Sequence, residues 1–275
     1  MARLDNEVNN PIAIRDPTTP QGRATTWLIG LDERTLCPSD DKLVQRWALA
    51  VMYFSTEGDD WFECSATDVM FCGTSGDFLN KEPFLSPVNE CQWAGIECNV
   101  DACVTEVVFE ENNLAGTIPS EIALLTDLAI WGMERGQMIG TIPTEVGRLT
   151  DLVFLDLDFN RLTGTLPTEL YLLTRLIQLD LNNNELSGNI EGIGTLTDVD
   201  FLQLHSNLFT GTVPESIGNF ERLNTFTLHN TLFVGTMPAS VCSLRLGGSL
   251  VSLIADCDPA DPEIVCDCCT TRRVA

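Results

Sequence analysis

A repeat of about two dozen residues runs through the middle of the chain and constrains its fold more than any other feature. Each unit reads L-x-x-L-x-L-x-x-N-x-L-x-G-x-I-P, most clearly from Leu152 to Pro167. The glycine of this motif recurs every 23 or 24 residues, at Gly116, Gly140, Gly164, Gly188, Gly211 and Gly235. One such unit cannot bury its leucines alone, so the repeats must stack and share one continuous core.

Each position that recurs in the repeats has a physical role. The L-x-L segment alternates, which predicts a short strand with its leucines directed inward. Glycine permits the turn that follows, and proline ends the pairing there. The asparagine can satisfy buried turn amides, and it occurs at Asn112, Asn160, Asn184 and Asn207. Gly136 and Thr231 replace this asparagine, and Glu191 replaces the proline of the fourth repeat, so we expect local irregularity at these positions.

These features predict an α/β solenoid of six full repeats and a partial seventh, Leu250–Asp256, with a parallel sheet on its concave face. The L-x-G-x-I-P unit resembles the plant-type extracellular leucine-rich repeats of receptor kinases, receptor-like proteins and polygalacturonase inhibitors. That resemblance implies a right-handed, curved solenoid with cysteine-rich caps. It also implies a recognition protein, without specifying the ligand.

The flanking segments resemble the caps of the same class. Cys91–Cys98, with the sequence CQWAGIEC, is similar to the N-terminal cap motif C-x-W-x-G-[VI]-x-C, which implies a Cys91–Cys98 disulfide. Gln45–Trp61 and Leu253–Cys269 are similar to the caps of algal, notably diatom, proteins that are secreted or membrane-anchored. The resemblance covers about residues 40–269.

The chain therefore divides into four predicted segments. These are a polar, disordered tail (1–17), a helical cysteine-rich cap (18–103), six repeats (104–249), and a partial repeat with a cysteine-rich cap (250–275). Within the N-terminal cap, Thr19 can begin a helix that runs to Leu31. Ser39 or Asp40 can begin a stronger helix that ends at Glu57-Gly58 and covers the open end of the first repeat. That helix is expected to place one apolar face on the core, formed by Leu43, Trp47, Val51 and Phe54.

The eleven cysteines are confined to the two ends, and none occurs from Val104 to Val241. This placement favours disulfide-bonded caps and an oxidising compartment. Cys64 and Cys72 are close enough to pair, which leaves Cys37 for Cys103 by elimination.

The C-terminal cysteines are odd in number. We expect disulfides among Cys242, Cys257, Cys266 and Cys268, with one cysteine left over that can support a disulfide-linked dimer. A thiolate metal site at Cys257 and Cys266-x-Cys268-Cys269 is the alternative.

No apolar leader opens the chain, and no run of about 18 apolar residues occurs. We therefore expect no direct membrane insertion by this chain. The cysteines predict an extracellular or cell-surface location, with any export signal or anchor outside these residues.

The charge balance excludes some partners. The 40 Asp and Glu residues exceed the 15 Lys and Arg residues, giving a net charge of −25. Nucleic-acid and anionic-membrane binding depend on Lys and Arg, so both are excluded. No catalytic motif is present and the chain has only two histidines, which predicts a protein that is not an enzyme and that has no cofactor or resident metal.

The repeat register predicts which side chains share the concave face. The seventh strand position is occupied by Glu110, Glu134, Asp158, Asn182, His205, His229 and Asp256, and the fifth by Asp156, Asp180 and Gln203. Because adjacent strands lie about 4.8 Å apart, His205 and His229 should stack on one another. Phe154, Phe201 and Phe159 are predicted to point outward, whereas Trp131 and Met133 fall on core positions.

Three interpretations of this face remain open. It can be a solvated polar surface, or a groove in which the acidic residues meet a basic or polyhydroxylated partner and the histidines add pH sensitivity. A divalent metal between the histidines is the third. The corresponding functions are recognition of a protein, peptide or glycan, with a co-receptor as a further partner, a structural or adhesive role in a wall or matrix, and inhibition of a secreted glycoside hydrolase.

Overall fold

The computed structural model describes Leu4 and residues 12–34, 42–67, 72–73, 78–257 and 264–273. The chain forms two compact units, residues 1–138 and 139–275, and each is described by itself. Within the described residues, no helix is long and apolar enough to cross a membrane.

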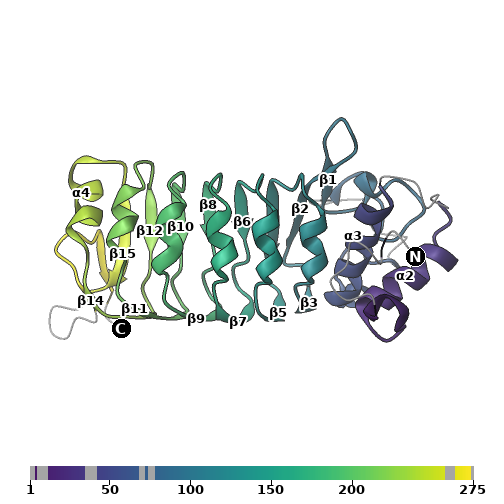
Figure 1. Ribbon diagram of the computed structural model, residues 1–275, viewed down its shortest axis with the longest axis horizontal. Helices are drawn as coiled ribbons and strands as arrows, with labels where there is room; N and C mark the ends of the chain where they lie inside the picture. Colours follow the sequence, from purple (N-terminus) through teal and green to yellow (C-terminus); the bar gives the residue numbers. More distant parts are fainter. Residues whose placement is uncertain are drawn as a thin grey trace. The chain divides into compact units, whose positions relative to one another are not determined.

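In the second unit the repeats form a strand, a turn and a second short stretch of strand, followed by a 3-10 helix or, in the last full repeat, by an α-helix (Figure 1). The first strands pair in parallel as one sheet: β6 (Phe154–Asp156), β8 (Gln178–Asp180), β10 (Phe201–Gln203), β12 (Thr225–Thr227), β15 (Ser252–Asp256) and β17 (Thr271–Arg273). The second stretches pair as another parallel ribbon: β7 (Arg161–Thr165), β9 (Glu185–Gly188), β11 (Leu208–Gly211) and β13 (Leu232–Phe233). β14 (Gly235–Thr236) pairs with β16 (Ile264–Val265).

The 3-10 helices follow the prolines because proline sets an extended residue before the turn. They are η6 (Thr144–Arg148), η7 (Thr168–Leu172), η8 (Glu191–Thr195) and η9 (Glu215–Asn219), followed by the α-helix α4 (Ala239–Gly247). Without a proline, Ile190 adopts φ −119° and ψ 29°, whereas Pro167 has φ −65° and ψ 142°. The expected irregularity at Glu191 is therefore present and local.

The core of this unit is the column of repeat leucines, which are fully buried. The Asn184 amide joins successive turns: its Oδ1 accepts from Leu162 N–H (2.9 Å) and its Nδ2 donates to Leu157 C=O (2.9 Å). At Thr231, the hydroxyl donates to Leu228 C=O (2.7 Å), and Asp256 accepts from the Thr231 amide instead. A threonine and an aspartate thus replace the missing asparagine.

Glycine is required at Gly164 and Gly188 for two reasons. Both have φ of +81°, and a Cβ would lie 2.8 Å from Thr141 Cγ2 and 2.7 Å from Thr165 Cγ2, respectively. A side chain at either position would strain the backbone and crowd the threonine of the preceding repeat.

The first unit holds the N-terminal cap and the first strands of the repeats. Its strands are β1 (Ile96–Cys98), β2 (Val104–Glu110), β3 (Ala115–Thr117) and β4 (Ile130–Glu134), and β5 (Gln137–Gly140) crosses the unit boundary along the sequence. Its helices are η1 (Ala13–Arg15), α2 (Pro20–Gly30), α3 (Leu43–Ser55), η2 (Gly58–Asp60), η4 (Glu90–Gln92) and η5 (Ser120–Leu124). β1 pairs with β2 antiparallel, and β2 pairs with β4 in parallel.

Both predicted helices of the cap are present, as α2 and α3. Thr19 caps α2 by accepting from Gly22 N–H (3.0 Å). The proposed caps of α3, Ser39 and Asp40, lie outside the described residues, and α3 is buried on most of its circumference rather than on one face. The disordered tail predicted over 1–17 is wrong at its end, because Ala13–Arg15 forms η1 and Ile14 is buried.

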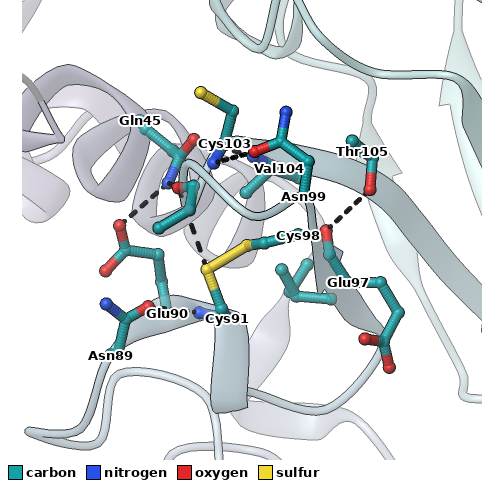
Figure 2. The surroundings of a disulfide bond; sticks show 12 residues. Gln45, Asn89, Glu90, Cys91, Glu97, Cys98, Asn99, Cys103, Val104 and Thr105 are labelled. Atoms are coloured by element: carbon teal, nitrogen blue, oxygen red, sulfur yellow. Dashed lines mark hydrogen bonds between the residues drawn. A yellow bond between two sulfur atoms is a disulfide. The ribbon is translucent and has the colours of Figure 1, made fainter.

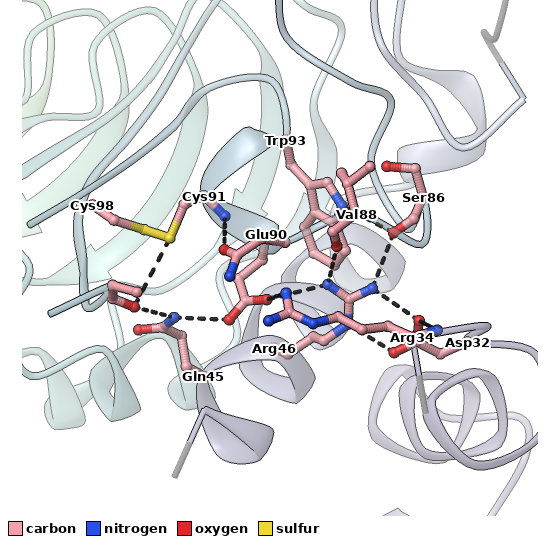
Figure 3. Close-up of polar contacts among 12 residues, drawn as sticks. Asp32, Arg34, Gln45, Arg46, Ser86, Val88, Glu90, Cys91, Trp93 and Cys98 are labelled. Atoms are coloured by element: carbon pink, nitrogen blue, oxygen red, sulfur yellow. Dashed lines mark hydrogen bonds and ion pairs between the residues drawn. A yellow bond between two sulfur atoms is a disulfide. The ribbon is translucent and has the colours of Figure 1, made fainter. Parts of the chain in front are cut away.

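A buried arginine organises the cap (Figure 3). Arg46 on α3 is 0% exposed and pairs with Asp32 through two nitrogens (2.7 and 2.9 Å) and with Glu90 (3.2 Å). Its guanidinium lies 4.5 Å from the ring centroid of Trp93. Gln45 also donates to Glu90 (2.9 Å), so α3, η4 and the segment after α2 meet at one hydrogen-bonded centre.

The structure pairs Cys91 with Cys98 and Cys64 with Cys72, the two N-terminal pairs expected from the sequence. Figure 2 shows the first of these beside Gln45 and Glu90. Cys103 is joined to none of the described residues by a disulfide. The Cys37–Cys103 pairing remains a prediction because Cys37 lies outside the described residues.

The C-terminal assignment needs a correction. The disulfides are Cys242–Cys268 and Cys266–Cys269, so Cys269 replaces Cys257 in the predicted set. Cys257 Sγ lies 3.0 Å from Cys269 Sγ. The three sulfurs of Cys257, Cys266 and Cys269 share one cluster, and residue order alone does not select the bonded pair.

Candidate functional site

The candidate site is the strand face opposite the 3-10 helices, taken in each unit separately. Glu110 and Glu134 lie in the first unit, at paired positions of β2 and β4. The remaining predicted residues lie in the second unit: Phe154, Asp156, Asp158, Phe159, Asp180, Phe201, Gln203, His205 and His229.

Two of the three predicted aromatics are exposed. Phe154 is 36% exposed and Phe159 is 47% exposed, whereas Phe201 is half-buried. Phe159 also has a left-handed backbone, with φ of 46°. The equivalent turn position of the other repeats is also left-handed, with φ between 52° and 56° at Glu111, Arg135, Asn183, Ser206 and Asn230. A left-handed backbone costs phenylalanine more free energy than it costs asparagine, so Phe159 carries a conformational cost.

Three of the acidic and histidine residues of this face are buried. Asp158 is 8% exposed, Asp180 is 4% and His229 is 8%. On a parallel sheet each outward side chain packs against its neighbours on adjacent strands, and this removes most of their contact with water. Asp158, Asp180 and His229 are therefore not freely solvated.

Burial raises the pKa of the Asp180 carboxyl, and hydrogen bonds from Asn182 and Gln203 partly oppose that rise. The Asn182 amide and side chain and the Gln203 side chain all donate to Asp180. The Asp180 carboxyl therefore accepts hydrogen bonds from residues of the same strand face.

A hydrogen-bond chain runs from Asp180 to His205. Gln203 Nε2 donates to Asp180, so Gln203 Oε1 faces Thr227 and accepts from its hydroxyl (3.4 Å). Thr227 Oγ1 also lies 2.8 Å from His205 Nδ1, and the direction of this hydrogen bond depends on the tautomer of the imidazole.

His205 and His229 stack as predicted, with ring centroids 4.4 Å apart and planes at 13°. Imidazole lone pairs lie in the ring plane, so two nearly parallel rings do not converge on one metal ion. The geometry therefore disfavours chelation between the histidines. At the C-terminus, a sulfur in a disulfide is not a thiolate, so the bonds of Cys266, Cys268 and Cys269 likewise disfavour a metal site there.

The sequence analysis missed several residues that shape this face. Thr227 and Gln178 belong to the polar network, with Gln178 Nε2 donating to Asp156 (3.1 Å). Both occupy strand positions that the repeat register identifies as outward, so the register could have revealed them. In the first unit, Glu106 and Val108 line a cavity of about 210 Å³, which no repeat pattern predicts because residues of the cap close it.

The chain is similar to leucine-rich-repeat proteins. The Leucine Rich Repeat family model matches residues 151–173. The ectodomain of the receptor kinase SOBIR1 from Arabidopsis thaliana is 30% identical with a TM-score of 0.50, over 53% of this chain and 87% of that one. No curated protein sequence matches the chain.

Two larger receptor ectodomains are also similar. GASSHO1/SCHENGEN3 from Arabidopsis thaliana, in complex with CASPARIAN STRIP INTEGRITY FACTOR 2, is 26% identical with a TM-score of 0.51, over 62% of this chain and 23% of that one. The Arabidopsis receptor kinase HAESA, in complex with the peptide hormone IDA and the co-receptor SERK1, is 27% identical with a TM-score of 0.53, over 57% and 27%. The chain thus spans about a quarter of these two.

Proposed function

The chain belongs to the leucine-rich-repeat family, and from that premise we propose that it is a non-catalytic recognition protein that binds a polypeptide on the exposed face of its repeat strands. The similar ectodomain of HAESA is seen with a peptide hormone. The proposal extends that kind of ligand to this chain.

The observation that carries the proposal is the exposed aromatic at a strained position. Phe159 keeps a bulky apolar side chain 47% exposed where φ is 46°. Neither folding stability nor solubility favours phenylalanine there, and exposed aromatics often anchor partners. Phe154, 36% exposed on the strand of the same repeat, adds a second apolar contact.

The proposed location is the cell surface or the extracellular space. Among the described residues, four disulfides hold the two ends of the chain, which is typical of proteins that fold in oxidising compartments. The proposed partner is therefore a secreted or surface-exposed polypeptide.

The experiment is a selection of binders from a displayed peptide library against the whole chain, with a glycan array run in parallel. We expect saturable peptide binders whose affinity falls at least tenfold in the Phe154→Ala/Phe159→Ala variant. Leu172→Ala is the matched control, because Leu172 is 60% exposed on η7, away from the strand face. Binders that are insensitive to the phenylalanines, or saturable binding to glycans only, would contradict the proposal.

A further inference from the structure

A cavity opens on the strand face of the first unit, over β1 and β2. Its lining combines apolar and charged side chains: Phe78, Lys81, Glu97, Glu106, Val108 and Glu110. Its volume of about 210 Å³ is below the roughly 300–1,000 Å³ of pockets that enclose a whole small molecule. The cavity is better suited to side chains that project from a larger partner.

The outward residues of β2 give this cavity a linear pattern. Glu106, Val108 and Glu110 are alternate residues of the strand, so all three face the same side, and the Cα atoms of the two glutamates are about 13 Å apart. Gly132 lies beside Val108 on β4 and contributes no side chain. A Cβ on Gly132 would lie 3.1 Å from Glu134 Oε1, so the Glu134 carboxylate lies close to the position that a side chain at Gly132 would occupy.

The charges in the cavity are not balanced. The Lys81 ammonium already has two partners, because its Nζ donates to Ile96 C=O (2.7 Å) and pairs with Glu97 (2.6 Å). Glu106 lies directly across from Glu97 in the β1–β2 register, and like charges in that arrangement repel. No ion pair to Glu106 is seen within the described part of the chain.

The other end of the cavity is also acidic. Glu110 lies 3.7 Å from Arg135, but that arginine is closer to Glu111, at 2.6 Å. Glu110 is half exposed, with 50% of its side chain accessible. A cation that reached the cavity would therefore meet carboxylates at both ends and an apolar wall between them.

We propose that this cavity binds an extended polypeptide segment of the pattern basic–x–apolar–x–basic. In an extended chain, alternate side chains share a face and the two basic residues are also about 13 Å apart. Their cationic groups would pair with Glu106 and Glu110, and the apolar residue would contact Val108 and Phe78. This inference rests on the proposed function, polypeptide recognition, but it concerns other strands than those of Phe154 and Phe159.

The test uses acetyl-Arg-Ser-Leu-Ser-Arg-amide as the probe, titrated into the ¹⁵N-labelled whole chain. We expect saturable shifts of the Gly95, Val108 and Gly132 amides, which border the cavity, and weaker binding as NaCl rises from 20 to 300 mM. Glu106→Gln/Glu110→Gln should weaken binding at least tenfold. The control Glu33→Gln/Asp101→Asn removes two charges from exposed positions of the same unit that do not line the cavity and should bind within twofold of the wild type.

A matched peptide with glutamine in place of both arginines should not saturate. Equal binding of that peptide, no saturable shift up to 5 mM of the probe, or unchanged binding by the Glu106→Gln/Glu110→Gln variant would overturn the inference. If the library binders that depend on Phe154 and Phe159 persist in that case, the proposed function stands and only this site is wrong. If they are also absent, both are wrong.

Discussion

At the residue scale, the exposed strand face contains two side chains that are held at an energetic cost. Phe159 occupies a left-handed position that favours asparagine, and Asp180 is a carboxylate that is 4% exposed. Within the described residues, Asp180 forms no ion pair, and its hydrogen-bond partners are amide donors. Substitutions at Phe159 and Asp180 therefore test whether backbone strain and carboxylate burial lower the stability of the protein.

Replacing Phe159 by asparagine and by alanine isolates the backbone strain, because both variants lose the ring. Asparagine tolerates a left-handed backbone better than alanine does, so Phe159→Asn should be more stable than Phe159→Ala by about 1 kcal/mol. Urea unfolding measures the difference. Phe154, on strand β6, is the control position, where asparagine should offer no advantage over alanine. Equal stabilities of the two Phe159 variants would mean that the turn is not strained.

The raised pKa of Asp180 predicts a pH-dependent effect of Asp180→Asn. Because burial disfavours the ionised form, the wild type loses stability as pH rises from its ordinary pKa of 3.8 through the raised folded-state pKa. The asparagine variant lacks this loss. The free energy of unfolding of the variant minus that of the wild type should therefore be larger at pH 7 than at pH 3, because only the wild type loses stability as pH rises. A difference that stays constant between these pH values, measured by urea unfolding, would contradict the prediction.

At the element scale, the N-terminal cap is held together by charge as well as by apolar packing. Arg46 has no exposed surface, and its partners Asp32 and Glu90 are 0% and 1% exposed. These three side chains come from α3, from the segment after α2 and from η4. Removing the cation leaves two carboxylates buried, which is far more costly than losing a surface pair.

Arg46→Ala should lower the free energy of unfolding of the cap by about 3–5 kcal/mol. Arg23→Ala is the matched control in the same unit, because Arg23 pairs with Asp59 at an exposed site (41% and 57% exposed). Its loss should cost about 1 kcal/mol or less. Tryptophan fluorescence follows the cap during denaturant unfolding, because Trp27 and Trp93 lie against Arg46. Similar effects of the two substitutions would show that the buried centre is not important for stability.

At the scale of the whole molecule, the distribution of cysteines and charge agrees with a protein that works outside the cell. The cysteine-free stretch from 104 to 241 is held by the leucine and asparagine columns, whereas the ends are held by disulfides. The net charge of −25 favours attraction of basic partners at long range. Location and partner chemistry are therefore linked proposals.

Disulfide mapping by mass spectrometry on thiol-blocked protein from its native source tests the location. We expect the pairs Cys64–Cys72, Cys91–Cys98, Cys242–Cys268 and Cys266–Cys269. Eight reduced thiols at these positions would indicate a reducing compartment. The extracellular proposal would then be wrong, although the fold would be unaffected.

The sequence by itself determined the repeat architecture. One repeat of 23 or 24 residues cannot bury leucines such as Leu155 and Leu179 alone, so the repeats must stack. The same register predicted the stacking of His205 on His229. It did not predict burial of Asp180, the bonding of Cys269, or the cavity at Glu106. Each of these depends on how side chains from distant segments fill the space around a residue, and only the tertiary structure decides that packing.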